Sequence, residues 1–555
     1  MTPLPDNMTT DRYQTGRIQT GKTRLVTAAS TAGTVFEWYD FFLYITMATA
    51  IAHNFFASAN ATSANIFALL AFATGFVVRP FGALVFGRLG DLFGRKHTFL
   101  ATIVIMGVST IFVGLLPTYE TAGILAPVLL TVLRMVQGLA IGGEYGGAAT
   151  YVAEHAPAGR RGAMTAWLQA SATLGFALSV AVVMLTRNMM GADTFLEWGW
   201  RIPFLASSIL LSISIWIRLK LEESPLFLSM KEAGELSKSP IRETFSSRKN
   251  VKLFVVAILG VVMGQSVVYV AGQIYALVFL TATLKVDPQI ANLLVLCALV
   301  LGLPAFVISG YMSDKIGRKP IILAACLLGA FGYMPLYKAL GHYANPALEA
   351  ATANAPIIVA ANIDECSVQF NPVGTSRFTS SCDVAKNALL NAGVPFLTRD
   401  AGPGATATVS IGDTTLQSAS LVDADGVAQF KSKLKEALVT AKYPATAKPE
   451  EINYPMVLVV LTIMSLLGAM SFGPIAAALT EFFPSRIRYT SVSVTYNLGN
   501  GWFGGLLPAA ATALQVATGN IYGGIWYPVV IAALTFVIGV TFLPSEHAKS
   551  VPLHS

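Results

Sequence analysis

Five ionisable side chains fall inside long apolar stretches of this sequence: Glu37, Asp40, Arg79, Arg134 and Glu144. A charge near the centre of a bilayer costs a few kcal/mol, so each of them is a candidate for a functional role. A buried carboxyl whose surroundings tune it can take up and release a proton near neutral pH. We therefore expect proton exchange at Asp40, Glu37 or Glu144.

The two carboxyls of the first apolar stretch share a helix face with a phenol. Glu37, Asp40 and Tyr44 stand at positions i, i+3 and i+7, which coincide on one side of an α-helix. We expect this face to point toward a central cavity, where Tyr44 can contact substrate.

The buried arginines suit an acidic ligand. Arg134 has Gln137 on the same helix face, and Arg79 precedes a proline that interrupts helical hydrogen bonding. A planar guanidinium donates two parallel hydrogen bonds to a carboxylate. Our hypothesis is that Asp40 or Glu37 carries the proton, while Arg79 and Arg134 bind a substrate carboxylate or keep these acids ionised. The alternative is a set of structural ion pairs that lock the N-terminal half and touch no ligand.

Polar side chains also mark two apolar stretches of the second half. Gln265, Tyr269 and Gln273 recur every four residues, and Asn497 and Asn500 lie in a later stretch. Such stripes either line a cavity and contact substrate or bind helices to one another. We include Gln265, Tyr269, Gln273 and Asn497 among the candidate substrate contacts.

The composition requires a membrane to surround these residues. Of 555 residues, 54% are hydrophobic and only 12% are charged, and the mean hydropathy is +0.61. Apolar runs of about 20 residues are long enough to cross a bilayer core of roughly 30 Å. Twelve such spans are predicted, at residues 26–50, 64–86, 98–116, 122–146, 163–186, 202–219, 253–280, 290–309, 321–340, 455–476, 491–515 and 523–543.

The distribution of charge indicates an orientation. The net charge of +7 comes from Lys and Arg that gather in alternate loops between the spans, which is typical of membrane topology and does not indicate a nucleic-acid partner. We expect a multi-pass protein of the bacterial inner membrane with both termini in the cytoplasm and no cleaved signal peptide. Nothing resembles a metal cluster, a phosphate-binding loop or a nucleophile with its base, so we expect no cofactor, no metal ion and no enzyme activity.

An internal repeat predicts two halves. The loop Gly-Arg-Leu-Gly-Asp-Leu-Phe-Gly-Arg-Lys at residues 87–96 recurs as Gly-Tyr-Met-Ser-Asp-Lys-Ile-Gly-Arg-Lys at 310–319, and Glu154 with Pro157 recurs weakly as Glu481 with Pro484. Two parallel six-helix halves explain both matches if about 100 extra residues are inserted between the third and fourth spans of the second half. The fold class predicted is therefore an all-α membrane protein with a small α/β insertion.

The predicted domains are a cytoplasmic N-terminal tail (1–25), an N-terminal six-helix half (26–219), a cytoplasmic central loop (220–252), helices seven to nine (253–340), a periplasmic inserted domain (341–452), helices ten to twelve (453–543) and a cytoplasmic tail (544–555). Within the insert, residues 356–370 and 406–421 look strand-like, while 383–392 and 427–440 look helical. Cys366 and Cys382 could form a disulfide in an oxidising compartment. The alternative is two unpaired thiols.

The repeated loop resembles the signature between the second and third helices of the major facilitator superfamily. Within it, Glu-Trp-Tyr-Asp-Phe at 37–41, Arg-Pro-Phe-Gly at 79–82, and Arg-Met-Val-Gln-Gly at 134–138 leading to Gly-Gly-Glu at 142–144 resemble the metabolite:proton symporter family, whose members carry organic acids or zwitterions. The resemblance covers the spans and not the insert. It implies that the repeated loops hold a cytoplasmic gate, with gating residues Asp91, Gly94, Arg95, Asp314, Gly317 and Arg318.

These observations together favour a secondary active transporter that carries a proton and a small organic solute, most simply a carboxylate metabolite, by alternating access. A facilitator or proton antiporter of the same fold stays open as an alternative. A membrane sensor that binds ligand through the insert is a third reading. The sequence leaves open whether the insert captures substrate or binds a periplasmic partner.

Overall fold

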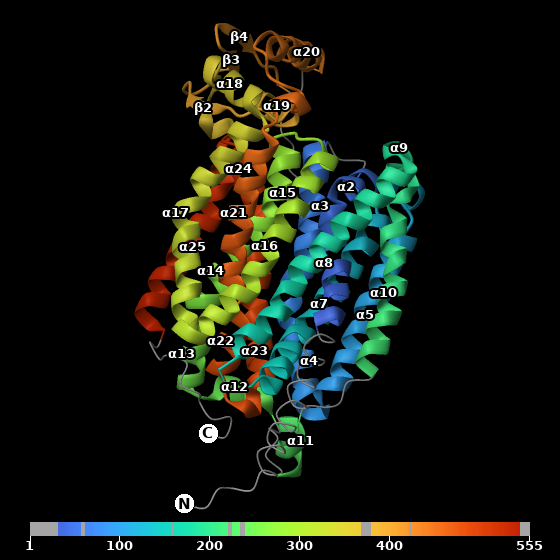
Figure 1. Ribbon diagram of the computed structural model, residues 1–555. Coiled ribbons are helices and arrows are strands. Elements are labelled where there is room, and N and C mark those ends of the chain that lie inside the picture. Colours follow the sequence, from blue (N-terminus) through green and yellow to red (C-terminus); the bar gives the residue numbers. More distant parts are fainter. Residues whose placement is uncertain are drawn as a thin grey trace, which may run out of the picture.

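A computed structural model describes residues 31–56, 61–157, 159–219, 225–233, 239–367, 379–420 and 424–543. The described chain forms a long helical bundle with a small α/β unit, residues 346–452, at one end (Figure 1). Buried apolar side chains run through the bundle and continue into the α/β unit.

Ten helices of the described residues are long and apolar enough to cross a membrane, judged by length and composition. They correspond to ten of the twelve predicted spans. The first and eleventh predicted spans are helical too, at residues 31–46 with α2 (Ala48–Phe55) and at α23 (Arg488–Leu498), η8 (Gly499–Gly504) and α24 (Leu507–Thr518). A turn at Met47 interrupts the former, and polar side chains lower the hydropathy of the latter, so a count of twelve spans stays a prediction.

The N-terminal half begins with the helical residues 31–46 and α2. It continues through α3 (Ala61–Val77), α4 (Arg79–Phe93), α5 (Arg95–Leu115), α6 (Tyr119–Ala122), α7 (Leu125–His155), α8 (Arg161–Met190), α9 (Ala192–Thr194), η1 (Phe195–Gly199) and α10 (Arg201–Leu219). The short helices α11 (Pro225–Glu232) and α12 (Pro240–Ser246) follow in the central segment.

The C-terminal half starts with one long helical segment built from α13 (Arg248–Ala257), η2 (Ile258–Val262), α14 (Met263–Tyr269), η3 (Val270–Tyr275), α15 (Ala276–Val278) and η4 (Phe279–Thr283). Then come α16 (Pro288–Ile316) and α17 (Arg318–Ala344). After the α/β unit the chain forms α21 (Tyr454–Phe472), α22 (Ile475–Phe482), η7 (Ser485–Ile487), α23, η8, α24, η9 (Gly523–Ile525) and α25 (Trp526–Phe542).

The repeated loops turn at their glycines, as predicted. Gly94 separates α4 from α5 with φ +107°, and Gly317 separates α16 from α17 with φ +97°. These backbone angles lie in the left-handed region that residues with a Cβ rarely adopt. The same turn therefore stands at corresponding points of the two halves.

Close helix packing holds the bundle together. A Cβ added to Gly138 on α7 would lie 1.9 Å from the carbonyl oxygen of Gly75 on α3, and one added to Gly82 on α4 would lie 2.0 Å from that of Leu139. Small residues let backbones approach in this way in membranes. Between the halves, α8 packs along α16 and α4 packs along α23.

The α/β unit contains a four-stranded sheet in the order β2-β1-β3-β4. Its strands are β1 (Ile357–Ala361), β2 (Leu397–Asp400), β3 (Thr408–Ile411) and β4 (Thr414–Gln417), and its helices are α18 (Pro346–Asn354), η5 (Ile363–Glu365), α19 (Ser381–Ala392), α20 (Ala424–Thr440) and η6 (Pro449–Glu451). β1 pairs parallel with β2, because α19 crosses between them, and antiparallel with β3. The two predicted helices are found, at α19 and α20. Of the two strand-like stretches, 406–421 contains β3 and β4, whereas 356–370 is a strand only at β1, continues into η5 and ends outside the described residues. β2 was missed because all four of its side chains are exposed and give no apolar pattern.

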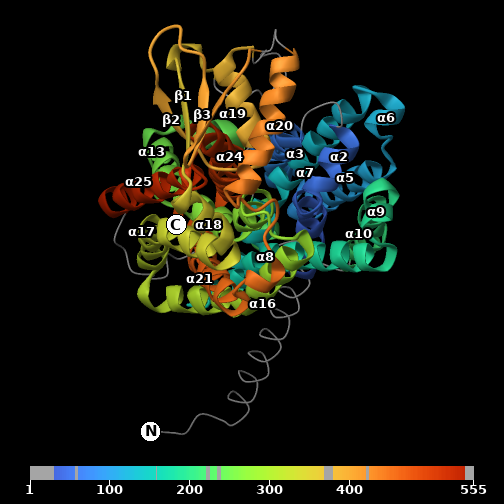
Figure 2. The same ribbon diagram turned by 90° about the horizontal axis from the view of Figure 1, so that it is seen from above.

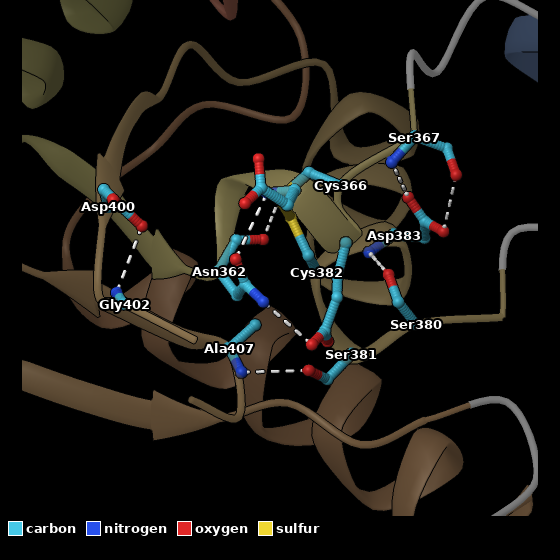
Figure 3. The surroundings of a disulfide bond; sticks show 12 residues. Asn362, Cys366, Ser367, Ser380, Ser381, Cys382, Asp383, Asp400, Gly402 and Ala407 are labelled. Carbon is cyan, nitrogen blue, oxygen red and sulfur yellow. Dashed lines mark hydrogen bonds between the residues drawn. A yellow bond between two sulfur atoms is a disulfide. The ribbon is translucent and has the colours of Figure 1, made fainter. Parts of the chain in front are cut away.

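The disulfide of the α/β unit joins Cys366 to Cys382, in the first turn of α19, with the two Cα atoms 5.3 Å apart (Figure 3). Beside it, Asp383 accepts hydrogen bonds from the Ser367 amide at 2.8 Å and the Ser367 hydroxyl at 3.1 Å. Ser380 caps α19 by accepting from the Asp383 amide at 3.0 Å. The segment after η5 is therefore tied to the start of α19 by one covalent bond and two hydrogen bonds.

The α/β unit is attached to the C-terminal half. The Phe396 amide donates to the Gly519 carbonyl at 2.9 Å, and the Ala447 amide donates to the Lys285 carbonyl at 3.0 Å. Seen from above, its strands lie over α13, α24 and α25 and away from α5 and α10 (Figure 2).

The chain leaves and rejoins the bundle at neighbouring points. Asn345 caps α18 just after α17 ends, and Asn453 caps α21. The Asn453 amide donates to the Tyr343 carbonyl at 2.9 Å. A backbone hydrogen bond therefore joins the residues that flank the two ends of the α/β unit.

Candidate functional site

A chain of buried polar groups joins Asp40 to Arg134 inside the N-terminal half. The Ser207 hydroxyl on α10 donates to the Asp40 carboxylate at 2.5 Å, and Thr110 on α5 is a second hydroxyl beside that carboxylate. Gln137 donates to Thr110 Oγ1 at 2.9 Å and accepts from Arg134 Nη1 at 2.7 Å. Arg134 is thus hydrogen-bonded through Gln137 to Thr110, which lies beside Asp40 and whose hydroxyl donates to the Met106 carbonyl at 3.0 Å.

The two predicted arginines both lie against the aromatic ring of Phe41. The guanidinium carbons of Arg79 and Arg134 lie 4.2 Å and 4.5 Å from the centre of the Phe41 ring. Phe76 also lies under Arg79 at 4.0 Å, and Tyr44 lies 4.6 Å from Arg134. Cation–π contacts of this kind stabilise a desolvated cation without neutralising it.

Neither arginine has an acidic partner among the described residues. The Nε and Nη2 atoms of both Arg79 and Arg134 are buried without a hydrogen-bond partner there. Nε and Nη2 form the edge of the guanidinium that donates two parallel hydrogen bonds to a carboxylate. In this conformation both arginines are enclosed in the bundle with this edge unpaired.

A third arginine forms ion pairs with the other two acids. Arg218 Nη2 lies 2.6 Å from Glu37 Oε1 and 2.7 Å from Glu144 Oε1, and all three side chains are buried. This corrects the expectation that Arg79 and Arg134 keep the acids ionised. Arg218 was missed because it lies one residue before the end of α10, where a basic residue is expected to anchor the helix at the membrane surface. The signal that could have found it is charge balance, since three buried acids faced only two buried arginines.

The three side chains of the predicted face of the first helix do not share one environment. Glu37 and Asp40 both bond to side chains of α10, in the same half, while Tyr44 packs against Arg134. The acids therefore face a neighbouring helix and not the interface between the halves, because α10 supplies the hydrogen-bond donors that a buried carboxylate requires.

Polar residues of the C-terminal half form hydrogen bonds with the N-terminal half. Thr173 on α8 donates to Gln273 Oε1 at 2.9 Å, and its hydroxyl lies 3.4 Å from that of Tyr269. Asn497 on α23 donates to the Gly142 carbonyl of α7 at 2.8 Å. Three of the predicted contacts are thus made to the opposite half.

Gln265 behaves differently from these residues. Its side-chain oxygen accepts from Asn500 at 3.4 Å, which joins α14 to η8 within the C-terminal half. Gln273 in addition donates to Ser465 on α21 at 3.3 Å. In this conformation the polar stripe of the seventh span binds helices together.

The aspartates of the repeated loops cap helices of the opposite half. Asp91 accepts from the amide and hydroxyl of Thr490, at 3.2 Å and 2.6 Å, in the first turn of α23. Asp314 accepts from the amides of Gly162 and Ala163, at 2.8 Å and 2.9 Å, in the first turn of α8. A carboxylate is favourable there because it meets free amides and the positive end of the helix dipole.

Ion pairs surround these caps at the bundle end opposite the α/β unit (Figure 1). Arg318 lies 2.7 Å from Asp314 and 3.0 Å from Glu481. Arg488 on α23 lies 3.4 Å from Glu154 on α7, which bridges the halves. Arg95 begins α5, but its side chain lies outside the described residues. Among the described residues no group of three or more His, Cys, Asp or Glu side chains is placed to hold a metal ion.

Known proteins share this sequence pattern and fold. The family of sugar (and other) transporters matches residues 25–244. The chain is 37% identical over 317 residues to the proline/betaine transporter of Salmonella typhimurium, covering 55% of this chain and 62% of that protein. It is 32% identical over 343 residues to the shikimate transporter of Escherichia coli, covering 61% of this chain and 77% of that protein.

Among solved structures, the proton:xylose symporter XylE of the major facilitator superfamily, bound to 6-bromo-6-deoxy-D-glucose, superposes with a TM-score of 0.60 over 96% of this chain and 98% of that chain, at 15% identity. The fold is therefore shared although the sequences have diverged. With its membrane-length helices, repeated loops and transporter relatives, the chain belongs to the major facilitator superfamily of transporters.

Proposed function

We propose that this protein is a proton-coupled symporter for a small organic solute with a carboxylate group, working in the bacterial inner membrane. The observation that carries this proposal is the pair of buried arginines without an acidic partner among the described residues. Transferring a charge from water into the protein interior is unfavourable unless an opposite charge interacts with it there. A solute carboxylate that enters between the halves supplies that partner.

The geometry favours a carboxylate over other anions or a neutral sugar. Arg79 and Arg134 each keep the Nε–Nη2 edge available, and their guanidinium groups share the Phe41 ring. A carboxylate matches that edge with two parallel hydrogen bonds. The relatives named above transport proline, betaine and shikimate, each of which carries a carboxylate, and this supports the same class for this chain.

Asp40 is the proposed proton carrier. It is buried, it accepts a hydrogen bond from the Ser207 hydroxyl, and no Lys or Arg of the described residues lies within 4 Å of it. Thr110 and Gln137 lie between it and Arg134. An anion on Arg134 therefore changes the electrostatic field at Asp40, which gives the two sites a physical coupling. The Glu37–Arg218–Glu144 cluster holds its acids in ion pairs and is assigned a supporting role.

Alternating access is proposed to operate through the repeated loops. We place both termini and these loops in the cytoplasm, the α/β unit in the periplasm, and twelve spans in between. The cross-half caps made by Asp91 and Asp314 hold the cytoplasmic end closed in this conformation. Rocking of the halves must break both caps at once, since each joins a loop of one half to a helix of the other.

The test is substrate-triggered proton movement in proteoliposomes with an external pH-sensitive dye. The panel pairs each carboxylate with an analogue that lacks the carboxylate charge, for example proline with prolinol and shikimate with its methyl ester. External alkalinisation with the acids alone supports carboxylate symport. Silence with the whole panel, from protein shown to be folded, would reject the proposal.

Variants assign the residues. Arg134→Gln and Arg79→Gln are expected to lower uptake at least tenfold, whereas Arg201→Gln, a matched change at the start of α10, retains it. Asp40→Asn is expected to abolish uphill, proton-driven accumulation. Full accumulation by Asp40→Asn would exclude it as the obligatory carrier. A facilitator or antiporter would instead show solute movement without co-directional proton flow.

The sensor alternative is separated by deleting residues 346–452. A symporter whose site lies between the halves keeps proton-coupled uptake without the α/β unit. A sensor that binds its ligand through this unit loses its response altogether.

A further inference from the structure

A cavity of about 530 Å³ lies in the α/β unit, between α19 and α20 and beside the outer end of η4. Its walls include Val394, Leu434, Leu438 and Tyr443, which are buried. Figure 2 shows α19 and α20 on the same side of the sheet, above the helical bundle. The cavity therefore has an apolar interior and lies apart from the arginines of the transport site.

Three lysines line this cavity, two from α20 and one from the turn after η4. Lys431 and Lys435 stand one helical turn apart on α20, and Lys285 follows η4. The described residues that line the cavity include no acidic side chain. Like charges at i and i+4 repel each other. Lys431 and Lys435 are exposed, so their mutual repulsion is small, and an anion between the ammonium groups would remove it.

Lys285 gives this cluster a fixed position. Its Nζ donates to the carbonyls of Ala392 at 2.7 Å and Pro444 at 3.3 Å, and no carboxylate of the described residues lies within 4 Å of it. Burial lowers the pKa of Lys285, so its charge is incompletely compensated by these two neutral acceptors.

The backbone at Lys285 is also unusual. Its φ is +55°, in the left-handed region that normally takes glycine at the end of a helix. Glycine would fit this turn with less strain, but it would remove the cation from the cavity. Lys285 nevertheless occupies this position, and its side chain ties the turn to the α/β unit through the Ala392 and Pro444 carbonyls.

We propose that this cavity binds a small organic carboxylate with an apolar body. The carboxylate lies among Lys285, Lys431 and Lys435, and the apolar body packs against Leu434, Leu438 and Val394. Lys285 directly follows the helical segment that carries Tyr269 and Gln273, so the ligand contacts the end of a helix that reaches the interface between the halves. This second site is independent of the proposed transport site.

The test is photolabelling with 4-benzoylbenzoate, a carboxylate with a photoreactive apolar body, on the full chain in phosphatidylcholine nanodiscs. Zwitterionic lipid avoids competition from anionic headgroups. Peptide mass spectrometry then locates the label. We expect saturable labelling of α19 and α20 that excess benzoate suppresses.

Matched variants make the result decisive. Lys431→Gln with Lys435→Gln should lower labelling of the α/β unit at least tenfold, while Lys433→Gln, an exposed lysine of α20 outside the cavity, should not change it. Val439→Glu, at a rim residue that is 70% exposed, should lower labelling by repulsion without disturbing the fold.

Three outcomes would overturn the proposal: equal labelling in the double variant, labelling confined to the helical bundle, or equal labelling by uncharged benzophenone. Because the label is located by peptide, loss of the α/β site is distinguished from failure of the transport site. Labelling in the bundle alone would support the transport site and reject this one.

Discussion

Replacing Arg218 by glutamine should strongly destabilise the N-terminal half. One guanidinium nitrogen, Nη2, lies 2.6 Å from Glu37 and 2.7 Å from Glu144, and the three side chains are 3 to 6% exposed. Removing one member of a buried ion pair typically costs about 3–5 kcal/mol, because the remaining charge is left unpaired. Here two carboxylates lose their cation, so we expect Arg218→Gln to reach the upper part of that range.

The charge balance provides its own control. Arg218→Gln combined with Glu37→Gln and Glu144→Gln removes all three charges, and such neutral replacements of buried ion clusters are often close to neutral for stability. The triple variant should therefore recover most of the lost free energy of unfolding. Arg201→Gln on the same helix should cost less free energy of unfolding. Arg201 donates to the Leu116 carbonyl and packs on the Trp200 ring, and it forms no ion pair with a described residue.

The assay is reversible unfolding in mixed micelles with increasing sodium dodecyl sulfate, followed by circular dichroism. The free energy of unfolding is compared among the wild type, Arg218→Gln, the triple variant and Arg201→Gln. The reasoning is refuted if Arg218→Gln is no less stable than Arg201→Gln, or if the triple variant is as unstable as the single one.

Three further changes test other parts of the structure. Asp91→Asn keeps the shape of the cap on α23 but removes its charge, so uptake should slow while membrane insertion stays normal; uptake at the wild-type rate would contradict the gating role. Gly138→Ala places a Cβ 1.9 Å from a carbonyl oxygen of the facing helix, and we expect no monodisperse protein in size-exclusion chromatography. Gly332→Ala, whose Cβ would lie 3.8 Å from Leu336 Cδ1, should elute normally. Cys366→Ser with Cys382→Ser opens a loop of 16 residues and should destabilise the α/β unit by about 3 kcal/mol, measured as faster hydrogen exchange in α19; unchanged exchange would show that the crosslink is dispensable.

The sequence predicted the features that local patterns encode. Apolar runs located the long helices because length and hydropathy are properties of a single segment. The two repeated loops predicted matching turns at Gly94 and Gly317, since glycine meets a backbone requirement that can be read from one position. The same reasoning located β1, β3, β4, α19 and α20 within the insert.

Contacts between distant segments could not be read in this way. Asp91 and Thr490 lie 399 residues apart, and Glu37 and Arg218 lie 181 residues apart, with no local signal that joins them. The helix face of Asp40 was predicted, but its direction depended on where α10 packs. Partner choice therefore required the fold, whereas the chemical type of each candidate residue did not.

The hydrogen bond between Asn453 and Tyr343 has an evolutionary consequence. An inserted unit whose two ends meet can be acquired or lost in a single recombination event, because the flanking helices keep their positions either way. The junction between α17 and α21 is thus a site where a separately folded unit can be inserted. A fluorescent protein with adjacent termini could replace the native unit there while these two helices keep their spacing.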